Sequence, residues 1–106
     1  MPKVSKNLMS KDIERRIWST LVRVFREVKT DAEVEVLLHD LFTLSERIMF
    51  SKRLAIAFLL SEGKTHVEIS KLLKVSFTTI NLVSSAKLRD GSGYRHLVEA
   101  LKRKLG

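Results

Sequence analysis

Apolar residues recur at helical spacing along nearly the whole chain. Over residues 11–28 they return every three or four positions, which places them on one helix face: Ile13, Ile17, Trp18, Leu21, Val24, Phe25 and Val28. The same period predicts five further helices, over residues 31–41, 44–62, 66–73, 77–89 and 94–104. Alternating β-branched stretches are absent and the single proline is Pro2, so the pattern predicts an all-α fold.

The ends of several helices carry their own signals. A threonine is followed three residues later by a glutamate at Thr30–Glu33, Thr43–Glu46 and Thr65–Glu68, which is the pattern of a capping box. Gly63 stands where a helix ending near residue 62 needs a left-handed residue. These signals predict the starts of the second, third and fourth helices.

The third predicted helix raises the question of oligomeric state. Residues Leu54–Leu60 are apolar on every side, and such a helix must be enclosed all round. The other helices are short, and the helix over residues 11–28 adds an apolar stripe that also needs a partner surface. We therefore predict an obligate homodimer with a shared core; a compact monomeric bundle is the alternative.

Composition narrows the class of protein. The 106 residues suffice for one domain and include no cysteine, which excludes disulfides and thiolate chemistry and suits a reducing compartment. The longest apolar run is Leu54–Leu60, far shorter than the roughly 20 residues that a membrane span needs. The first residues lack the apolar segment of a signal peptide. We expect a cytoplasmic protein with no membrane partner.

The charge balance is strongly basic. The formal net charge is +8 and the isoelectric point is about 10.1, values typical of nucleic-acid-binding domains. Residues 1–29 carry +5, residues 30–42 carry −4, and residues 63–90 and 91–106 carry +3 each. Solvated helix faces that keep the protein soluble would give the same excess, so charge alone leaves both interpretations open.

Residues 65–83 have the spacing of a helix-turn-helix. Ser70 is small where the two helices cross, Val75 fills the angle between them, and Ser76 is a good N-cap for the second helix. Inward-facing positions carry Ile69, Leu73, Ile80 and Val83. Lys74 replaces the usual glycine of the turn, which predicts a positive φ at a lysine. A plain helical hairpin is the alternative interpretation. We expect a flexible arm over residues 1–10 and one domain over residues 11–106, with its helix-turn-helix at about 65–89.

A helix-turn-helix places its second helix in the major groove of DNA. The residues predicted to read bases are Phe77, Thr78, Thr79 and Asn81. Asn81 can pair with adenine and the apolar groups can touch thymine methyls, whereas no arginine is present to read guanine. Phosphate contacts are expected from Lys64, Thr65, His66, Lys71, Lys74 and Ser76.

Four segments resemble one known family. They are Leu41–Arg47, Lys52–Leu54, Glu62–Thr65 and Thr78–Ile80, and they resemble the tryptophan repressor (TrpR) superfamily, most closely its TrpR-like YerC/YecD type. The resemblance implies a six-helix, intertwined homodimer. It also implies a transcriptional regulator, by the family's habit a repressor, that binds operator DNA through the fourth and fifth helices.

The same resemblance argues against L-tryptophan as a corepressor. In tryptophan-binding members the indole lies between two arginines, with a threonine near the amino-acid end and a small residue beside the second arginine. Thr43 and Arg53 match, but Leu82 and Val83 stand in place of the second arginine and the following glycine. Loss of a guanidinium removes a stacking partner and a charge for the carboxylate. We therefore predict an effector pocket around Thr43, Arg53, Leu82 and Val83 that does not bind free L-tryptophan tightly, and we leave open whether any other effector binds.

Other activities find little support. The three histidines, His39, His66 and His96, lack metal-ligand spacing, and no motif places a serine nucleophile, so we expect no enzyme activity, metal or cofactor. A different class of function stays open: a protein-interaction adaptor, or a module like the promoter-reading region of a sigma factor, using the same helical motif. Salt dependence of duplex binding separates that class from a DNA-binding regulator.

Overall fold

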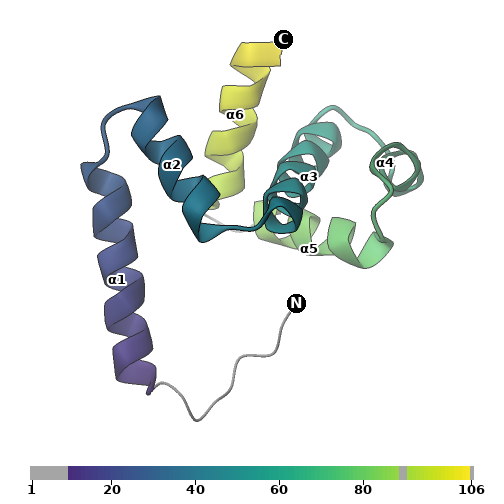
Figure 1. Ribbon diagram of the computed structural model, residues 1–106. Helices are drawn as coiled ribbons and strands as arrows, with labels where there is room; N and C mark the ends of the chain where they lie inside the picture. The colour runs from purple at the N-terminus through teal and green to yellow at the C-terminus, as the bar shows by residue number, and fades with distance from the viewer. Residues whose placement is uncertain (1–9, 89–90, 106) are drawn as a thin grey trace. The chain divides into compact units, whose positions relative to one another are not determined.

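The computed structural model describes residues 10–88 and 91–105, and those residues contain six α-helices and no strand (Figure 1). The helices are α1 (Lys11–Glu27), α2 (Asp31–Leu41), α3 (Leu44–Ser61), α4 (His66–Leu73), α5 (Phe77–Leu88) and α6 (Gly93–Leu105). The all-α prediction is confirmed, with helix ends within about one residue of those expected. The arm predicted for residues 1–10 lies almost wholly outside the described residues.

Local chemistry explains where the helices begin. At both Thr43 and Thr65 the full capping box is formed, because the threonine hydroxyl accepts from the glutamate N–H and the glutamate carboxylate accepts from the threonine N–H. At α2 only half of it forms: the Glu33 N–H donates to Thr30 Oγ1 at 3.2 Å, and the Thr30 hydroxyl donates to the Glu33 carboxylate. Helix α1 stops at Glu27 because Val28 turns extended, with φ −70° and ψ 141°.

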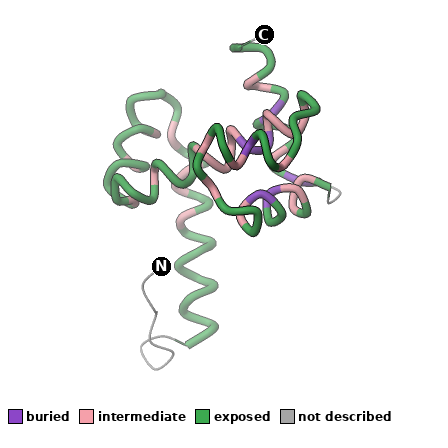
Figure 2. The backbone as a smooth tube through the Cα atoms, turned by 90° about the vertical axis from the view of Figure 1, so that its right-hand side faces the viewer, coloured by how far each residue is buried: buried purple, intermediate pink, exposed green. Residues whose placement is uncertain are grey.

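Residues 42–105 form one compact unit, built on α3. Helices α4, α5 and α6 each pack against α3. The buried apolar residues of this unit come from all four helices: Ile56, Ala57, Ile69, Ile80, Val83 and Val98. Buried positions are purple along the backbone in Figure 2. Leu59, Leu60, Leu73, Val75 and Tyr94 pack against this cluster from its edge. The core therefore lies directly beneath α4 and α5.

Residues 10–41 form a second unit, made of α1 and α2. Neither helix contains a buried residue. The apolar stripe predicted for α1 is formed, but none of it is buried. Its first residues are exposed, with Trp18 at 66%, and its later ones are half-buried: Leu21, Val24, Phe25 and Val28. On α2, Val36 and Leu41 are exposed as well. The backbone hydrogen bonds of α1 and α2 are made within each helix, whereas their apolar faces are not buried.

No described helix is long and apolar enough to cross a membrane.

Candidate nucleic-acid interface

The turn between α4 and α5 is the feature that fixes the angle of the two helices. Lys74 adopts the left-handed conformation, with φ 55° and ψ 51°, and it is the one non-glycine residue among those described that has a positive φ. The Ser70 hydroxyl donates to the Val75 carbonyl oxygen at 2.8 Å and so ties α4 across the turn. The positive φ predicted for Lys74 is confirmed, and Ser70 has a hydrogen-bonding role that its small size alone did not indicate.

The inner surface of this motif is apolar and closed. Ile69 on α4 and Ile80 on α5 are fully buried, and Val83 is 2% exposed. Leu73 and Val75 are half-buried against the same cluster. The predicted inward-facing residues are therefore confirmed, and together they hold α4 and α5 on α3 as one rigid support for the outer face.

The start of α4 is fixed by Thr65 and Glu68. Glu68 N–H donates to Thr65 Oγ1 at 3.2 Å, and Glu68 Oε1 accepts from the Thr65 N–H at 3.0 Å. These hydrogen bonds, with that of the Thr65 backbone foremost, and the nearby Lys64 charge lower the pKa of Glu68 below its ordinary 4.5. The carboxylate therefore stays ionised at neutral pH, at the end of the helix where a negative charge is favourable.

The start of α5 is capped by Ser76, as predicted. Its Oγ accepts from the Thr79 N–H at 3.2 Å and lies 3.0 Å from Thr79 Oγ1. Thr79 is half-buried and its hydroxyl faces the cap, so it contributes to the start of the helix as well as standing on the predicted reading surface. Ser76 itself is exposed.

The outer face of α5 carries the other predicted base-reading residues. Thr78 and Asn81 are exposed, and Phe77 is 51% exposed. The rings of His66 and Phe77 meet edge to face, with centroids 6.5 Å apart, which brings the beginnings of α4 and α5 together. Beyond Asn81, Leu82 also lies on the exposed side of α5.

The predicted phosphate-binding residues lie just before α4, on α4 and in the turn that leads to α5. Lys64, Thr65, Lys71 and Lys74 are exposed, Ser76 is exposed beside them in the chain, and His66 is half-buried. Glu68 is the only acidic residue between residues 65 and 83. The arrangement offers hydrogen-bonding and apolar groups in the middle of the face and positive charge near it, which is the composition that DNA reading requires.

The four predicted effector-pocket residues occupy different environments. Thr43 caps α3, and the Arg53 guanidinium lies 5.9 Å from the centre of the Phe50 ring. Leu82 is 65% exposed, whereas Val83 is part of the packed core. The Val83 side chain thus lies in the core.

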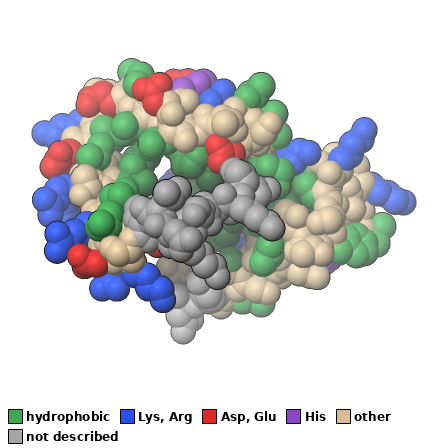
Figure 3. Space-filling model, turned by 60° about the horizontal axis from the view of Figure 1, so that its bottom comes forward, with side chains coloured by type: hydrophobic (Ala, Val, Ile, Leu, Met, Phe, Trp, Pro, Cys, Tyr) green, Lys and Arg blue, Asp and Glu red, His purple; other side chains and the backbone are tan. Residues whose placement is uncertain are grey.

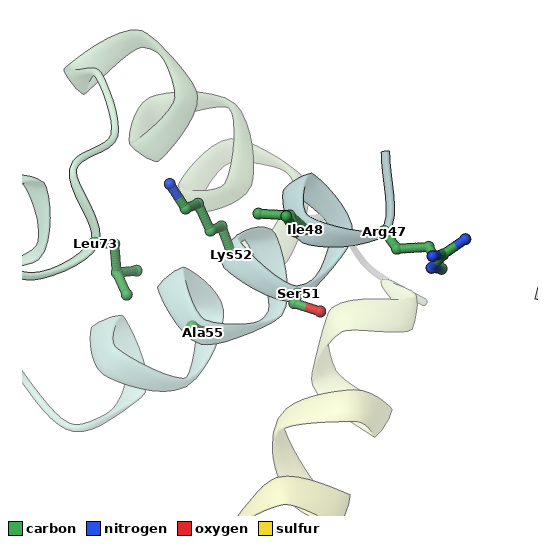
Figure 4. Close-up of a pocket in the computed structure, with 6 residues that line it drawn as sticks. All are labelled: Arg47, Ile48, Ser51, Lys52, Ala55 and Leu73. Carbon is green, nitrogen blue, oxygen red and sulfur yellow. The ribbon is translucent and has the colours of Figure 1, made fainter. Parts of the chain in front are cut away.

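A separate cavity of about 350 Å³ lies between α3 and the end of α4 (Figure 4). Its lining consists of Arg47, Ile48, Ser51, Lys52, Ala55 and Leu73. Figure 4 shows the Arg47 guanidinium and the Ser51 hydroxyl pointing away from Leu73, with Lys52 extending on the opposite side. The polar groups diverge, so this cavity does not focus them on one ligand. Within residues 10–88 and 91–105, no cluster of three or more side chains could hold a metal ion.

Comparison with known proteins agrees with this geometry. The family model described as Trp repressor protein matches residues 16–102, which span all but the first few residues of α1 and the end of α6. Comparisons with curated proteins and with solved structures gave no match. The family consists of DNA-binding regulators and not of enzymes. This chain belongs to the Trp repressor family, whose members are helix-turn-helix DNA-binding regulators.

Proposed function

We propose that this protein is a sequence-specific transcriptional regulator that binds operator DNA as a homodimer and acts as a repressor. The observation that carries the proposal is the outer face of α5. It presents Phe77, Thr78 and Asn81 to solvent on a helix-turn-helix that is rigidly supported from below. Family membership supports DNA as the ligand.

In this proposal α5 enters the major groove with its first turns against base edges. The Asn81 amide pairs with adenine, and Phe77 and the threonine methyl groups contact thymine methyls. Phosphates are bound by Lys64, Lys71 and Lys74, which set orientation and affinity without reading sequence. The half-site we expect is therefore rich in A·T pairs.

The uncovered apolar surfaces support a homodimer. On α1, Ile17 and Trp18 are exposed, and on α3 the exposed set includes Leu44, Ile48 and Phe50. Large apolar side chains exposed on a helix face are typical of an interaction site. A second copy of the chain covers these faces in the proposal, and residues 11–106 then act as a single domain preceded by the arm over residues 1–10.

We propose further that free L-tryptophan is not the corepressor. Leu82 supplies no guanidinium to the predicted pocket, and the Val83 side chain belongs to the core. Calorimetric titration with L-tryptophan should therefore release no heat attributable to micromolar binding. A saturable isotherm in that range would contradict this part of the proposal. The YerC/YecD assignment rests on the quoted segments and stays a prediction.

Selection of random duplexes by the purified protein, with sequencing of the input and bound pools, tests the function as a whole. We expect an enriched near-palindrome with half-sites about one helical turn apart. Affinity for that duplex should fall steeply between about 50 mM and 200 mM salt. Failure to recover any duplex at low salt would contradict the proposal and favour the adaptor.

Two substitutions separate base reading from phosphate binding. Asn81→Ala should lower affinity for the selected duplex and relax the choice of base at one position of each half-site, by about 1–3 kcal/mol. Lys71→Ala should weaken all duplexes alike and reduce the steepness of the salt dependence. If both variants bind like the wild type, α5 does not lie in the groove.

A further inference from the structure

Helix α1 carries a second face that its apolar stripe leaves unexplained. Lys11, Arg15, Arg23 and Arg26 are all exposed, and at 100° per residue they fall on one side of the helix, opposite Ile13, Ile17 and Val24. From Lys11 to Arg26 this cationic face is about 22 Å long at 1.5 Å per residue. Blue side chains stand along the left edge of Figure 3, with red ones among them.

The acidic residues of α1 do not neutralise this face. Arg16 forms a salt bridge with Asp12, with the two atoms 3.2 Å apart. Among the described residues, Lys11, Arg15, Arg23 and Arg26 form no salt bridge. Glu14 stands on the apolar side of the helix. Asp12 lies on the same side of the helix as the four cations but is paired with Arg16, and Glu27, exposed at the edge of that side, forms no salt bridge with Arg23 or Arg26. The side keeps an excess of positive charge, and such a surface attracts a polyanion.

We propose that the cationic face of α1, formed by Lys11, Arg15, Arg23 and Arg26, binds the DNA backbone outside the groove that α5 occupies. The inference rests on the proposed function, because a second copy that covers the apolar face of α1 leaves the opposite, cationic face turned outward. Its length matches about six base pairs of duplex at 3.4 Å per step. These contacts add affinity and no sequence preference.

The chemistry of α1 favours DNA over a lipid surface as the polyanion. A helix lying on a membrane buries its apolar side between the lipids. That side holds Ile17 and Trp18, which the homodimer requires. Backbone contacts to DNA need the charges alone, so they are compatible with an α1 whose apolar face is already covered.

The test is made in the full chain and replaces two of the four residues of the cationic face with neutral ones. The variant Arg15→Gln/Arg26→Gln keeps helix-forming side chains and removes four charges per dimer. The control variant Lys102→Gln/Arg103→Gln changes the net charge equally at exposed positions in the last turn of α6. Affinity for the selected operator, embedded in a longer duplex, is measured at several salt concentrations, and the mass of each variant in solution is checked beforehand.

We expect the α1 variant to bind the operator at least about tenfold more weakly at 0.1 M salt, with the magnitude of the log–log salt slope reduced by about 2–4. The enriched sequence should stay the same, and the control should bind within about twofold of the wild type. Equal losses in both variants, or no loss in the α1 variant, would overturn the proposal.

Two further arms make the result specific. In the first, vesicles containing phosphatidylserine are offered to the wild type and to the α1 variant. If the wild type binds the vesicles and the variant does not, while both bind DNA with the same affinity, the cationic face binds a membrane and the proposal is overturned. Lys71→Ala identifies the cause of a negative result. If Lys71→Ala weakens binding and the α1 variant does not, the inference fails alone, whereas no DNA binding by the wild type means that the proposed function fails.

Discussion

The two compact units differ in how they satisfy their apolar side chains. Helices α3–α6 enclose Ile56, Ile69 and Ile80 completely within residues 42–105. Helices α1 and α2 bury no residue, although the apolar stripe of α1 is as regular as any in the chain. Burying a side chain such as leucine or isoleucine stabilises by about 1.5–3 kcal/mol. Helices α1 and α2 have yet to realise that stabilisation, whereas helices α3–α6 already have it.

The two units should therefore differ in how their stability depends on protein concentration. The buried cluster of α3–α6 is built from contacts within one chain, so the stability of these helices should vary less with protein concentration than that of α1. In the proposed homodimer the second copy covers the apolar face of α1, so the order and function of α1 should vary with concentration. Each prediction below tests one side of this difference.

The largest effect should follow from a charge placed on the apolar face of α1. Ile17→Asp puts two carboxylates into the proposed dimer interface, one from each copy, and unpaired charges there are strongly unfavourable. We expect association to weaken by at least about 1,000-fold, or about 4 kcal/mol. Analytical ultracentrifugation measures this. An Ile17→Asp protein with the dimer mass at micromolar concentration would show that α1 is not at the interface.

The next largest effect comes from the same substitution made in both units. Ile80→Ala should lower the free energy of unfolding by about 2–5 kcal/mol, because Ile80 is completely buried. Ile17→Ala should change it by less than about 0.5 kcal/mol at a concentration where the protein is monomeric, because Ile17 is 57% exposed there. Urea denaturation followed by circular dichroism gives both values. Equal losses would remove the distinction between the units.

A smaller effect is expected at the turn of the helix-turn-helix. Lys74→Gly relieves the left-handed conformation of a non-glycine residue and should stabilise the protein by about 1 kcal/mol, raising Tm by a few degrees. The same change removes a proposed phosphate contact, so duplex affinity should fall for all sequences alike. Lys71→Ala serves as the comparison, since it should lower affinity without raising Tm. A lower Tm for Lys74→Gly would contradict the expectation.

The smallest effect concerns pH and the start of α4. Because the pKa of Glu68 is lower in the folded protein, its ionised form stabilises the fold at pH values above 4.5. That contribution is lost as the pH falls from 4.5 through the lowered pKa. The Tm difference between wild type and Glu68→Gln should therefore narrow as the pH is taken from 7 to 3. A difference that stays constant would show that the Glu68 charge does not stabilise α4.

Sequence reasoning was most reliable where neighbouring residues decide the structure. The helix starts at Thr43 and Thr65, the positive φ of Lys74 and the burial of Ile69 and Ile80 were all predicted. Each of these depends on residues within a few positions, or on a helical period that repeats locally. The spacing of the motif was enough to identify them.

Features that arise between distant residues were less accessible. The edge-to-face contact of His66 with Phe77 joins the starts of two helices, and no spacing rule places those rings together. The hydrogen bond from the Ser70 hydroxyl to the Val75 carbonyl oxygen was not predicted, because the small size of Ser70 already accounted for its position. The net charge of residues 1–29 does not reveal that Lys11, Arg15, Arg23 and Arg26 lie on one side of α1. The structure adds that Arg16 is paired with Asp12 and these four residues are not.

The placement of the whole buried cluster within residues 42–105 also bears on how much protein a cell must make. A subunit that holds its own core can form a complete α4–α5 motif before it meets a partner, by fast local folding steps. If pairing follows as a separate bimolecular step, the amount of dimer at low abundance rises with the square of subunit concentration. Operator occupancy would then respond to changes in expression more steeply than it would for a protein that binds as a single chain.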